Sequence, residues 1–455
     1  MPQADSPDSV RSPSTGPPRA CSHAAPARCW ACVDLSAIAH NLRRLRSRLS
    51  NNARLTVMVK ANGYGHGAVE VARAALAAGA EGLGVARLSE GLELRSAGLS
   101  APIRLSGPCL EDEFQAGIEA GLVFTVCSED EIRALAARAR AFHQGLRLGG
   151  RTKVQLLLDT GMGRGGFGPE ELGSGAARVC AERTLELEGV FSHFTSAEEP
   201  DPAPVREQTA LFRRAVEGLE RLGIRIPLKH LANSAATLFH PETHLDLVRC
   251  GLAVYGLRDW PKERDRLDLR PALSLHTRIA HLARRPAGWA VGYNRTHLCR
   301  RDSWLATLAA GYGDGYPRSL SNRGQVLIRG RRCPILGRIS MDYLTVDLTD
   351  LVPAAGLPER GEEATLIGEG ANGERITVEE LARGADSSPY LITTQLPAQL
   401  ERRCRGSAGS EAQSGEGVRM ELRGPPTRTL PVLSVALRGA AKEGERNSRR
   451  KAAGA

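Results

Sequence analysis

Between Leu55 and Leu257, short apolar runs alternate with longer segments that are apolar only at the spacing of a helix. The short runs are apolar throughout, which is typical of strands that are buried on both faces of a parallel sheet. In chain order they are LTVMVK, GLGVAR, IRLSG, VFTVC, VQLLLDT, LEGVFSHF, PLKHLANS and LVRCGLAVYGL. The helical segments between them include AVEVARAALAAGA, SEGLELRSAGL, SEDEIRALAARARAF and REQTALFRRAVEGLERL.

Eight such units predict an α/β fold, an N-terminal (β/α)8 barrel of the TIM type. An open, doubly wound sheet is the alternative interpretation, but the G-x-G-x-x-G typical of that fold does not follow the first strand. Beyond about Leu269 the pattern changes to short strands separated by Gly, Pro and Asp turns. This second pattern predicts a C-terminal, mostly antiparallel β domain.

The two ends of the chain contain few large apolar side chains and cannot offset the entropy lost on ordering. We therefore expect four parts. They are a disordered N-terminal extension (1–28), the barrel (29–268), the β domain (269–404) and a disordered basic tail (405–455).

The net charge of +10 does not belong mainly to the predicted domains, because the tail from Arg405 alone has ten Lys or Arg and five Glu. Nucleic-acid binding by the folded part is therefore not expected. No apolar run is long enough to span a bilayer, and the N-terminus lacks the apolar core of a secretory signal, so we expect a cytoplasmic protein without a membrane partner. The pair Cys29 and Cys32 forms a C-x-x-C motif, but the second Cys or His pair of a zinc site is missing, and no metal is expected.

Five polar residues fall at or just beyond the ends of predicted barrel strands, where barrels place their catalytic groups. They are Lys60, Arg164, His193, Ser234 and Arg249. Lys60 is the first, and an apolar wall beside it would lower the pKa of its ammonium group, as a Schiff-base lysine requires. A solvated lysine at a strand end is the simpler alternative.

The other candidates suit an anionic ligand. Arg164 lies in the glycine-rich loop DTGMGRGGF, where a guanidinium group can bind a carboxylate or a phosphate; a solvated loop arginine is the alternative. Ser234, in HLANSAAT, offers a hydroxyl and free N–H groups at a strand-to-helix transition, a geometry that binds phosphate or simply caps a helix. Arg249 lies inside the apolar eighth strand and must find a partner there.

Several longer motifs occur in an order that resembles the alanine racemase family. They are VMVKANGYGHG, DTGMGRGGF, SHF, HLANSAAT, VRCGLAVYGL, VGYN, GYGDGYPR and GRISMDYLTVD, and the resemblance extends from about Cys29 to Glu401. It implies a pyridoxal 5'-phosphate (PLP)-dependent isomerase that interconverts L-alanine and D-alanine through an external aldimine. It further implies a head-to-tail homodimer with composite active sites that supplies D-alanine for cell-wall peptidoglycan.

The resemblance also implies roles for individual residues. Lys60 and Tyr293 correspond to the two catalytic bases, and Arg249 and His193 would be the cations that make Tyr293 a better base. The positions that correspond to cofactor-binding residues are Lys60, Tyr64, His193, Ser234, Arg249, Gly251 and Tyr390. Those that correspond to substrate-binding residues are Arg164 and Met341, the latter through its backbone N–H.

Several positions depart from the family pattern, among them Gly63, which stands where alanine is common before YGHG. Leu157 stands where many members carry a carbamylated lysine that braces the arginine of MGR, Asn294 stands where glycine is usual, and the residues after Tyr390 differ from the usual sequence. A racemase of serine or another small amino acid is the nearest alternative function. Decarboxylases of the same fold use a glycine-rich phosphate-binding run and a catalytic cysteine in the β domain, and this sequence has neither in place. A PLP carrier built on a lone barrel, or an inactive binding module, would not need both Lys60 and Tyr293.

Overall fold

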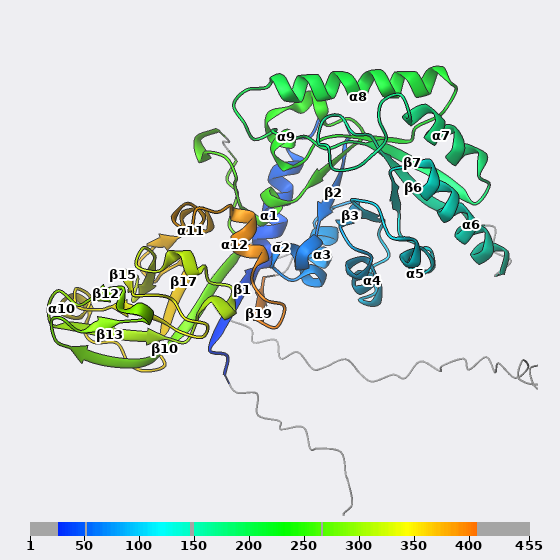
Figure 1. Cartoon of the computed structure of the whole chain (residues 1–455). Coiled ribbons are helices and arrows are strands. Elements are labelled where there is room, and N and C mark those ends of the chain that lie inside the picture. Colours follow the sequence, from blue (N-terminus) through cyan, green and yellow to red (C-terminus); the bar gives the residue numbers. More distant parts are fainter. Residues whose placement is uncertain (1–25, 51, 146–149, 265–266, 407–455) are drawn as a thin grey trace, which may run out of the picture. The chain divides into compact units, whose positions relative to one another are not determined.

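The structure is a computed structural model that describes residues 26–50, 52–145, 150–264 and 267–406 (Figure 1). Apart from residues 26–28 and 405–406, the predicted N-terminal extension and basic tail lie outside the described residues. The boundaries expected for these two segments therefore stay predictions.

Eight parallel strands form the N-terminal barrel, and each contains part of one of the eight apolar runs. They are β2 (Arg54–Met58), β3 (Gly82–Val85), β4 (Ile103–Leu105), β5 (Phe124–Val126), β6 (Thr152–Leu157), β7 (Leu185–Phe191), β8 (Leu228–His230) and β9 (Leu247–Cys250). They pair in two ladders, β4-β3-β2-β9 and β5-β6-β7-β8.

Backbone hydrogen bonds join the two ladders at both seams. Leu105 N donates to Val123 O at 3.0 Å between β4 and β5, and Arg249 N donates to Ala232 O at 2.9 Å between β8 and β9. The ring is therefore closed, and the predicted (β/α)8 barrel is confirmed.

Helices surround the barrel because each buries one apolar stripe against the strands. They are α1 (Leu35–Arg46), α3 (Ala68–Ala77), α4 (Leu88–Ser96), α5 (Phe114–Glu119), α6 (Glu129–Gly145), α7 (Leu172–Ala181), α8 (Ala203–Arg221) and α9 (Ser234–Phe239). In α8 the stripe consists of Val205, Phe212, Val216 and Leu219, which are all buried.

The C-terminal domain is an antiparallel sheet that closes on itself, as predicted in kind. Its strands are β10 (Leu273–Arg285), β13 (Ser303–Leu308), β14 (Gln325–Ile328), β15 (Arg331–Leu336), β16 (Leu344–Asp347), β17 (Glu363–Glu369) and β18 (Arg375–Ile376). A second pairing of β17, with β10, closes the ring. A two-stranded ribbon, β11 (Ala290–Val291) with β12 (His297–Leu298), and the helices α10 (Val352–Ala355), α11 (Val378–Gly384) and α12 (Pro389–Thr394) complete the domain.

One strand differs from the expected division of the chain. β1 (Cys29–Asp34) falls in the range expected for the barrel, but it pairs antiparallel with β10 and parallel with β19 (Glu401–Arg405), so it belongs to the large sheet. The apolar letters CWACV predict a strand without saying which sheet it joins. Asp34, the last residue of β1, also caps α1 by accepting from Ser36 N and Ala37 N, so the chain passes directly from the sheet to the barrel helices.

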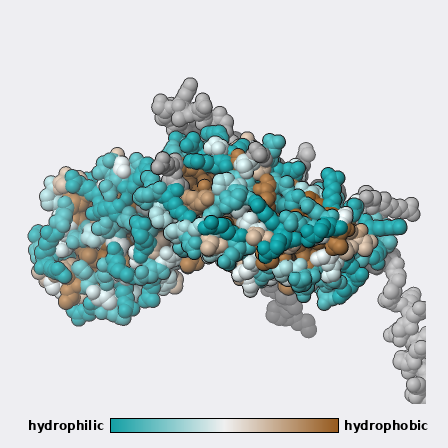
Figure 2. All heavy atoms as spheres, turned by 90° about the horizontal axis from the view of Figure 1, so that it is seen from above, coloured by the Kyte–Doolittle hydropathy of each residue, from teal (hydrophilic) through white to brown (hydrophobic). Residues whose placement is uncertain are grey.

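The surface of the molecule is mixed. On the face that Figure 2 shows, hydrophobic residues form separate small patches among hydrophilic ones. Within the described ranges, no helix combines the length and the apolar composition that crossing a membrane requires.

Candidate active site

A cavity of about 200 Å³ opens at the C-terminal ends of the barrel strands. Its lining contains eight of the ten predicted site residues, together with six that were not predicted to bind a ligand. The full set is Met58, Lys60, Tyr64, Ser106, Leu157, Arg164, Phe191, His193, Asn233, Ser234, Arg249, Gly251, Leu252 and Tyr390.

Lys60 stands at the start of an unusual left-handed turn, labelled α2 (Lys60–Tyr64) in Figure 1. Ala61, Asn62, Gly63 and Tyr64 have φ angles of 51°, 53°, 60° and 51°. Such angles cost L-residues other than Gly, Asn and Asp about 1–2 kcal/mol each. Hydrogen bonds offset this cost: Ala61 N donates to Glu90 Oε1 at 2.6 Å, Gly63 N to Val59 O at 2.8 Å and Ala68 N to Asn62 Oδ1 at 3.0 Å.

The environment of Lys60 favours its neutral amine. Burial lowers the pKa of the ammonium group, and the charges of Arg164 and Arg249 lower it further, while Glu90 opposes them. A neutral amine is the form that condenses with an aldehyde and accepts a proton. The lysine is therefore not a simple solvated residue at a strand end.

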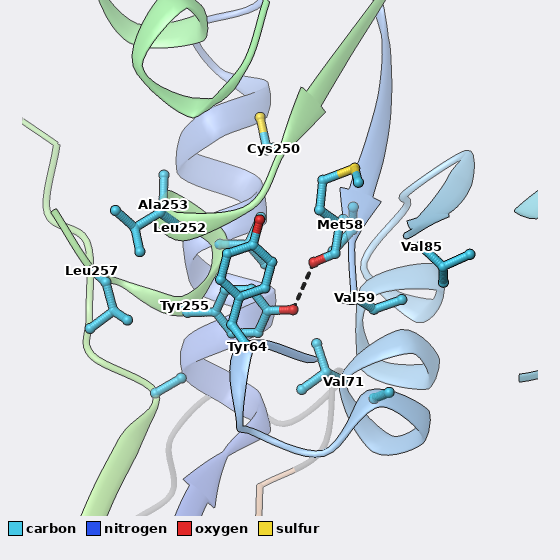
Figure 3. Packing of buried hydrophobic residues seen from close by; sticks show 14 of the residues in the cluster. Met58, Val59, Tyr64, Val71, Val85, Cys250, Leu252, Ala253, Tyr255 and Leu257 are labelled. Atoms are coloured by element: carbon cyan, nitrogen blue, oxygen red, sulfur yellow. Dashed lines mark hydrogen bonds between the residues drawn. The ribbon is translucent and has the colours of Figure 1, made fainter. Parts of the chain in front are cut away.

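Tyr64 lines the cavity and packs against two other tyrosines, of which Figure 3 shows Tyr255. Its ring centroid lies 4.9 Å from that of Tyr255 and 6.0 Å from that of Tyr390 in α12. Burial raises the pKa of Tyr64, so its hydroxyl stays protonated and can donate a hydrogen bond. Gly251 leaves the room that this hydroxyl needs, because a Cβ at Gly251 would lie 2.4 Å from Tyr64 Oη.

The start of α9 forms the polar end of the cavity. Asn233 caps this helix by accepting from Ala236 N at 2.9 Å. Ser234 Oγ accepts from Gly251 N at 2.9 Å, which leaves the hydroxyl hydrogen free to donate. The hydroxyls of Ser234 and Tyr64 thus offer two neutral donors to an oxyanion.

Arg249 finds the partners that its buried position requires, and all of them are neutral. Its guanidinium donates to His230 Nδ1 at 2.7 Å, Ser192 O at 2.7 Å and Leu231 O at 3.1 Å, and it lies 3.4 Å from His193 Nδ1. Burial lowers the pKa of Arg249 to about 10, so the group still carries its charge at neutral pH. Among the residues that the structure describes, no carboxylate pairs with this charge, which leaves it available to a ligand in the cavity.

His193 differs from the expectation that it adds a second positive charge. Burial, followed by the charges of Arg249, Arg164 and Lys60, lowers the pKa of His193 to about 3. The imidazole is therefore neutral, and the positive charge of this wall comes from Arg249 and Arg164.

The predicted carboxylate-binding side is open. Arg164 is exposed and lies in the loop after β6, whose backbone is held by Asp159 through bonds from Gly161 N at 2.8 Å and Gly163 N at 2.9 Å. Leu157 lines the cavity with an apolar side chain, so position 157 gives Arg164 no anionic brace.

Two predicted residues do not reach this cavity. Tyr293 follows β11 in the β domain and is 68% exposed, and Met341 is 55% exposed. Asn294 adopts a φ of 61°, a left-handed conformation that explains why glycine or asparagine suits this position. Within the described part of one chain, the cavity therefore contains Lys60 but not Tyr293, the predicted second base.

Five lining residues were missed by sequence reasoning and a sixth, Leu157, was noted only as a departure. Asn233 carried a signal, since a cap is expected just before Ser234. Phe191 stacks on His230 with centroids 5.0 Å apart and lies under the guanidinium of Arg249 at 5.1 Å, a contact that no local pattern shows. Met58, Ser106 and Leu252 carried no signal beyond their strand-end positions.

Two family models match the chain. The model described as "Alanine racemase, N-terminal domain" matches residues 33–259, and "Alanine racemase, C-terminal domain" matches residues 272–404. The chain belongs to the alanine racemase family. Members of this family are PLP-dependent isomerases.

Individual relatives agree with this assignment. The chain is 42% identical over 373 residues to the alanine racemase of Symbiobacterium thermophilum, covering 82% of this chain and 96% of the relative. It is 40% identical over 377 residues to the alanine racemase of Desulforamulus reducens, and the match covers 82% of this chain and 98% of the relative. Among solved structures, the alanine racemase of Streptomyces lavendulae superposes with a TM-score of 0.77 at 38% identity, covering 84% and 98%. The structure of the alanine racemase of Bacillus anthracis with bound L-Ala-P superposes with a TM-score of 0.78 at 32% sequence identity. This match covers 85% of this chain and 97% of the other.

The residues in the cavity fit the family's cofactor. PLP has an aldehyde, a ring nitrogen and a phosphate group. The cavity provides an amine with a lowered pKa in Lys60, a buried cation without an acidic partner in Arg249, and hydroxyl donors in Tyr64 and Ser234. Across the described ranges, no group of three or more His, Cys, Asp or Glu side chains could hold a metal ion.

Proposed function

We propose that this protein interconverts L-alanine and D-alanine with PLP held in the barrel cavity. One observation carries the proposal: Lys60, with its lowered pKa, and the buried cation Arg249 line the same cavity at the barrel mouth. Lys60 would bind the aldehyde carbon, Arg249 would face the ring nitrogen, and Tyr64, Ser234 and the N–H groups beside them would hold the phosphate. Tyr390 and His193 would complete the walls.

The chemistry requires removal and return of the proton on the substrate Cα. When bound, PLP supplies the conjugated system that stabilises negative charge at this carbon. Lys60 Nζ would accept the proton as an amine or return it as an ammonium group on one face, and the phenol oxygen of Tyr293 would do the same on the other. Arg249 keeps its own proton at neutral pH and would donate a hydrogen bond to the ring nitrogen of the cofactor without transferring a proton to it. Arg164 and the backbone N–H of Met341 would hold the substrate carboxylate.

We further propose a head-to-tail homodimer, because a single chain leaves Tyr293 and Met341 at its surface. Other large hydrophobic side chains of the β domain are exposed as well, namely Trp289, Leu298, Tyr312 and Tyr343. A second copy that brings this face to the cavity would supply the missing base. A reducing compartment such as the cytoplasm suits the protein, since the nine cysteines of the described residues are all free.

The first experiment tests cofactor, site and substrate together. Purified protein should show PLP absorbance, and borohydride reduction should fix a pyridoxyl group on Lys60; label on the exposed Lys153 or on Lys229 would contradict the assignment. The enzyme is then offered a panel of L-amino acids, and loss of optical rotation is followed. L-alanine should react fastest, whereas a preference for L-serine would assign the protein to another small amino acid.

The second experiment tests the composite site. Lys60→Ala and Tyr293→Phe should each abolish most activity when homodimeric. When the two variant proteins are mixed and their subunits are allowed to exchange, they form heterodimers. In each heterodimer one active site carries both substitutions and the other carries neither. About a quarter of the wild-type activity should therefore return. If both bases came from one chain, mixing would restore none.

A further inference from the structure

A buried glutamine on α8 connects two loops at the mouth of the barrel. Gln208 lies in the stripe that α8 turns toward the strands, between Val205 and Phe212, and its side chain is buried. It makes hydrogen bonds to the loop after β6, which carries Arg164, and to the loop after β7, which carries His193. A polar side chain in an apolar stripe destabilises the fold unless it is hydrogen-bonded, so its partners indicate why it is there.

The amide of Gln208 makes all four hydrogen bonds of which it is capable. Its Nε2 donates to Thr160 Oγ1 at 2.9 Å and to His193 O at 3.0 Å. Its Oε1 accepts from Thr195 N and from Thr195 Oγ1, both at 3.1 Å. The backbone N–H of Thr195 can only donate and the carbonyl of His193 can only accept, so the orientation of the amide is fixed. A side chain that lacks the donor or the acceptor would leave one of these loops without its bond.

Thr160 extends the connection to the buried cation of the cavity. Its Oγ1 lies 2.7 Å from Ser192 Oγ, and Ser192 O accepts from Arg249 Nη2 at 2.7 Å. The side chains of Thr160 and Ser192 are both buried, so water does not compete for these bonds. A continuous series of hydrogen-bonded residues therefore runs from α8, through the start of the arginine loop, to Arg249.

The loop that carries Arg164 depends on such bonds because side-chain packing does not fix it. A Cβ built at Gly161, Gly163 or Gly165 would meet no atom within 4 Å. These glycines stand on both sides of Arg164, which is itself exposed. The bonds made through Thr160, the residue before this open segment, therefore help to determine where the guanidinium group lies.

We propose that Gln208 is a positioning residue, which holds the loop after β6 so that Arg164 keeps its place relative to His193 and Arg249. This inference rests on the proposed function, in which Arg164 binds the carboxylate of the substrate. The carboxylate is not the group that reacts, so Arg164 would bind it equally in the ground state and in the transition state. A displaced Arg164 should therefore raise KM and leave kcat almost unchanged.

The test measures racemisation of L-alanine by the PLP-loaded enzyme and its variants. Gln208→Met keeps the approximate size of the side chain but removes its donor and acceptor. It should raise KM for L-alanine about tenfold, while kcat stays within about twofold of the wild type. An unchanged KM in the folded variant, or a fall in kcat without a rise in KM, would overturn the proposal.

Variants at the other end of the bond separate this role from general stability. Thr160→Val removes the hydroxyl between Gln208 and Ser192 and should raise KM as Gln208→Met does, whereas Thr160→Ser keeps a hydroxyl and should retain the wild-type KM. Equal KM values for the two Thr160 variants would contradict the proposal. If Gln208→Met does not fold, this comparison decides.

Thr209→Val is the matched control on the same helix. Thr209 is the buried neighbour of Gln208, and its hydroxyl donates to Val205 O within α8 at 2.7 Å. The variant should keep the wild-type KM. A rise as large as that of Gln208→Met would show that any loss of a polar group from this helix disturbs the site, and the specific role of Gln208 would be wrong.

Hydrogen–deuterium exchange of the same holoproteins gives a measurement that does not depend on turnover. Peptides that cover residues 158–167 should exchange about tenfold faster in Gln208→Met than in the wild type, while peptides from β3, in the other ladder of the barrel, should not change. Unchanged exchange in the loop would overturn the proposal. If the wild type fails to racemise L-alanine but Gln208→Met still loosens the loop, the proposed function is wrong and the positioning role of Gln208 stands.

Discussion

His66, in the NGYGHG motif beside the catalytic turn, should make the protein sensitive to acid. The side chain is completely buried, its Nδ1 lies 2.9 Å from Tyr64 O, and its ring lies 4.5 Å from that of Tyr255. A carbonyl oxygen only accepts, so Nδ1 carries the hydrogen and Nε2 has a lone pair. Nε2 has no hydrogen-bond partner in the part of the chain that the structure describes. Protonation would therefore place an unpaired charge in an apolar environment.

The size of this effect follows from the pKa. Burial lowers the pKa of His66 from 6.5 to about 4, and the nearby charge of Arg402 adds to the shift. Below pH 6.5 the unfolded chain binds a proton that the folded chain does not, so the free energy of unfolding falls as the pH falls. One pKa unit corresponds to about 1.4 kcal/mol, so His66 should cost about 2 kcal/mol at pH 5 and about 3 kcal/mol at pH 4.

His66→Asn removes the titrating group and keeps an amide that can donate to Tyr64 O. Urea unfolding of the holoenzyme, followed by tryptophan fluorescence from pH 7.5 to pH 4.5, measures the result. The variant should be less stable than the wild type at pH 7.5, because it leaves a cavity, but should lose about 2 kcal/mol less between pH 7.5 and pH 5. The exposed His281→Asn is the matched control and should follow the wild type. Parallel pH curves for His66→Asn and the wild type would refute the reasoning.

Two further predictions concern stability. Glu188→Gln leaves the buried guanidinium of Arg104 without the carboxylate that it contacts at 2.9 and 3.0 Å. The free energy of unfolding at pH 7, measured by urea unfolding, should therefore fall by about 3–5 kcal/mol. The control Asp302→Asn removes a carboxylate from an exposed pair with Arg284 and should lower the free energy of unfolding by less than about 1 kcal/mol. Gly65→Ala should lower the melting temperature and weaken PLP binding, because φ is +83° and the new Cβ would lie 1.9 Å from Thr393 O. Gly98→Ala has a similar φ of +81° and nothing within 4 Å, so an equal loss of cofactor affinity there would contradict this explanation.

The barrel could be predicted because its strands are coded locally. A strand such as β6 is buried on both faces, so its apolar letters stand out without knowledge of its neighbours. The partner of β1 could not be predicted in this way, because pairing with β10 joins residues about 245 positions apart in the chain, such as Trp30 and His276. The left-handed turn after Lys60 was likewise hidden, since Ala61 and Tyr64 are not residues that normally mark positive φ.

The sequence predicted the position of some site residues in the cavity, but not the charge state or the subunit of others. Strand-end position alone brought Lys60, His193 and Arg249 to one cavity, since all three follow or lie in barrel strands. The charge state of His193 was not predictable, because it depends on how deeply the fold buries that imidazole and on how closely it packs Arg249 and Arg164 around it. Tyr293 has a proposed role only through another subunit, which the pattern of one chain does not encode.

The β domain holds the turn that follows Lys60 within its own chain, in addition to the role proposed for Tyr293 in a second chain. Arg402 Nε of β19 donates to Gly65 O at 2.8 Å, and the backbone of Thr393 lies against Gly65 so closely that no Cβ fits between them. Tyr390 of the adjacent helix α12 enters the cavity beside Tyr64. These contacts hold the left-handed turn that sets the direction of Lys60. We therefore expect a barrel without its own β domain to lose the geometry of Lys60, even with Tyr293 supplied by a second subunit as proposed.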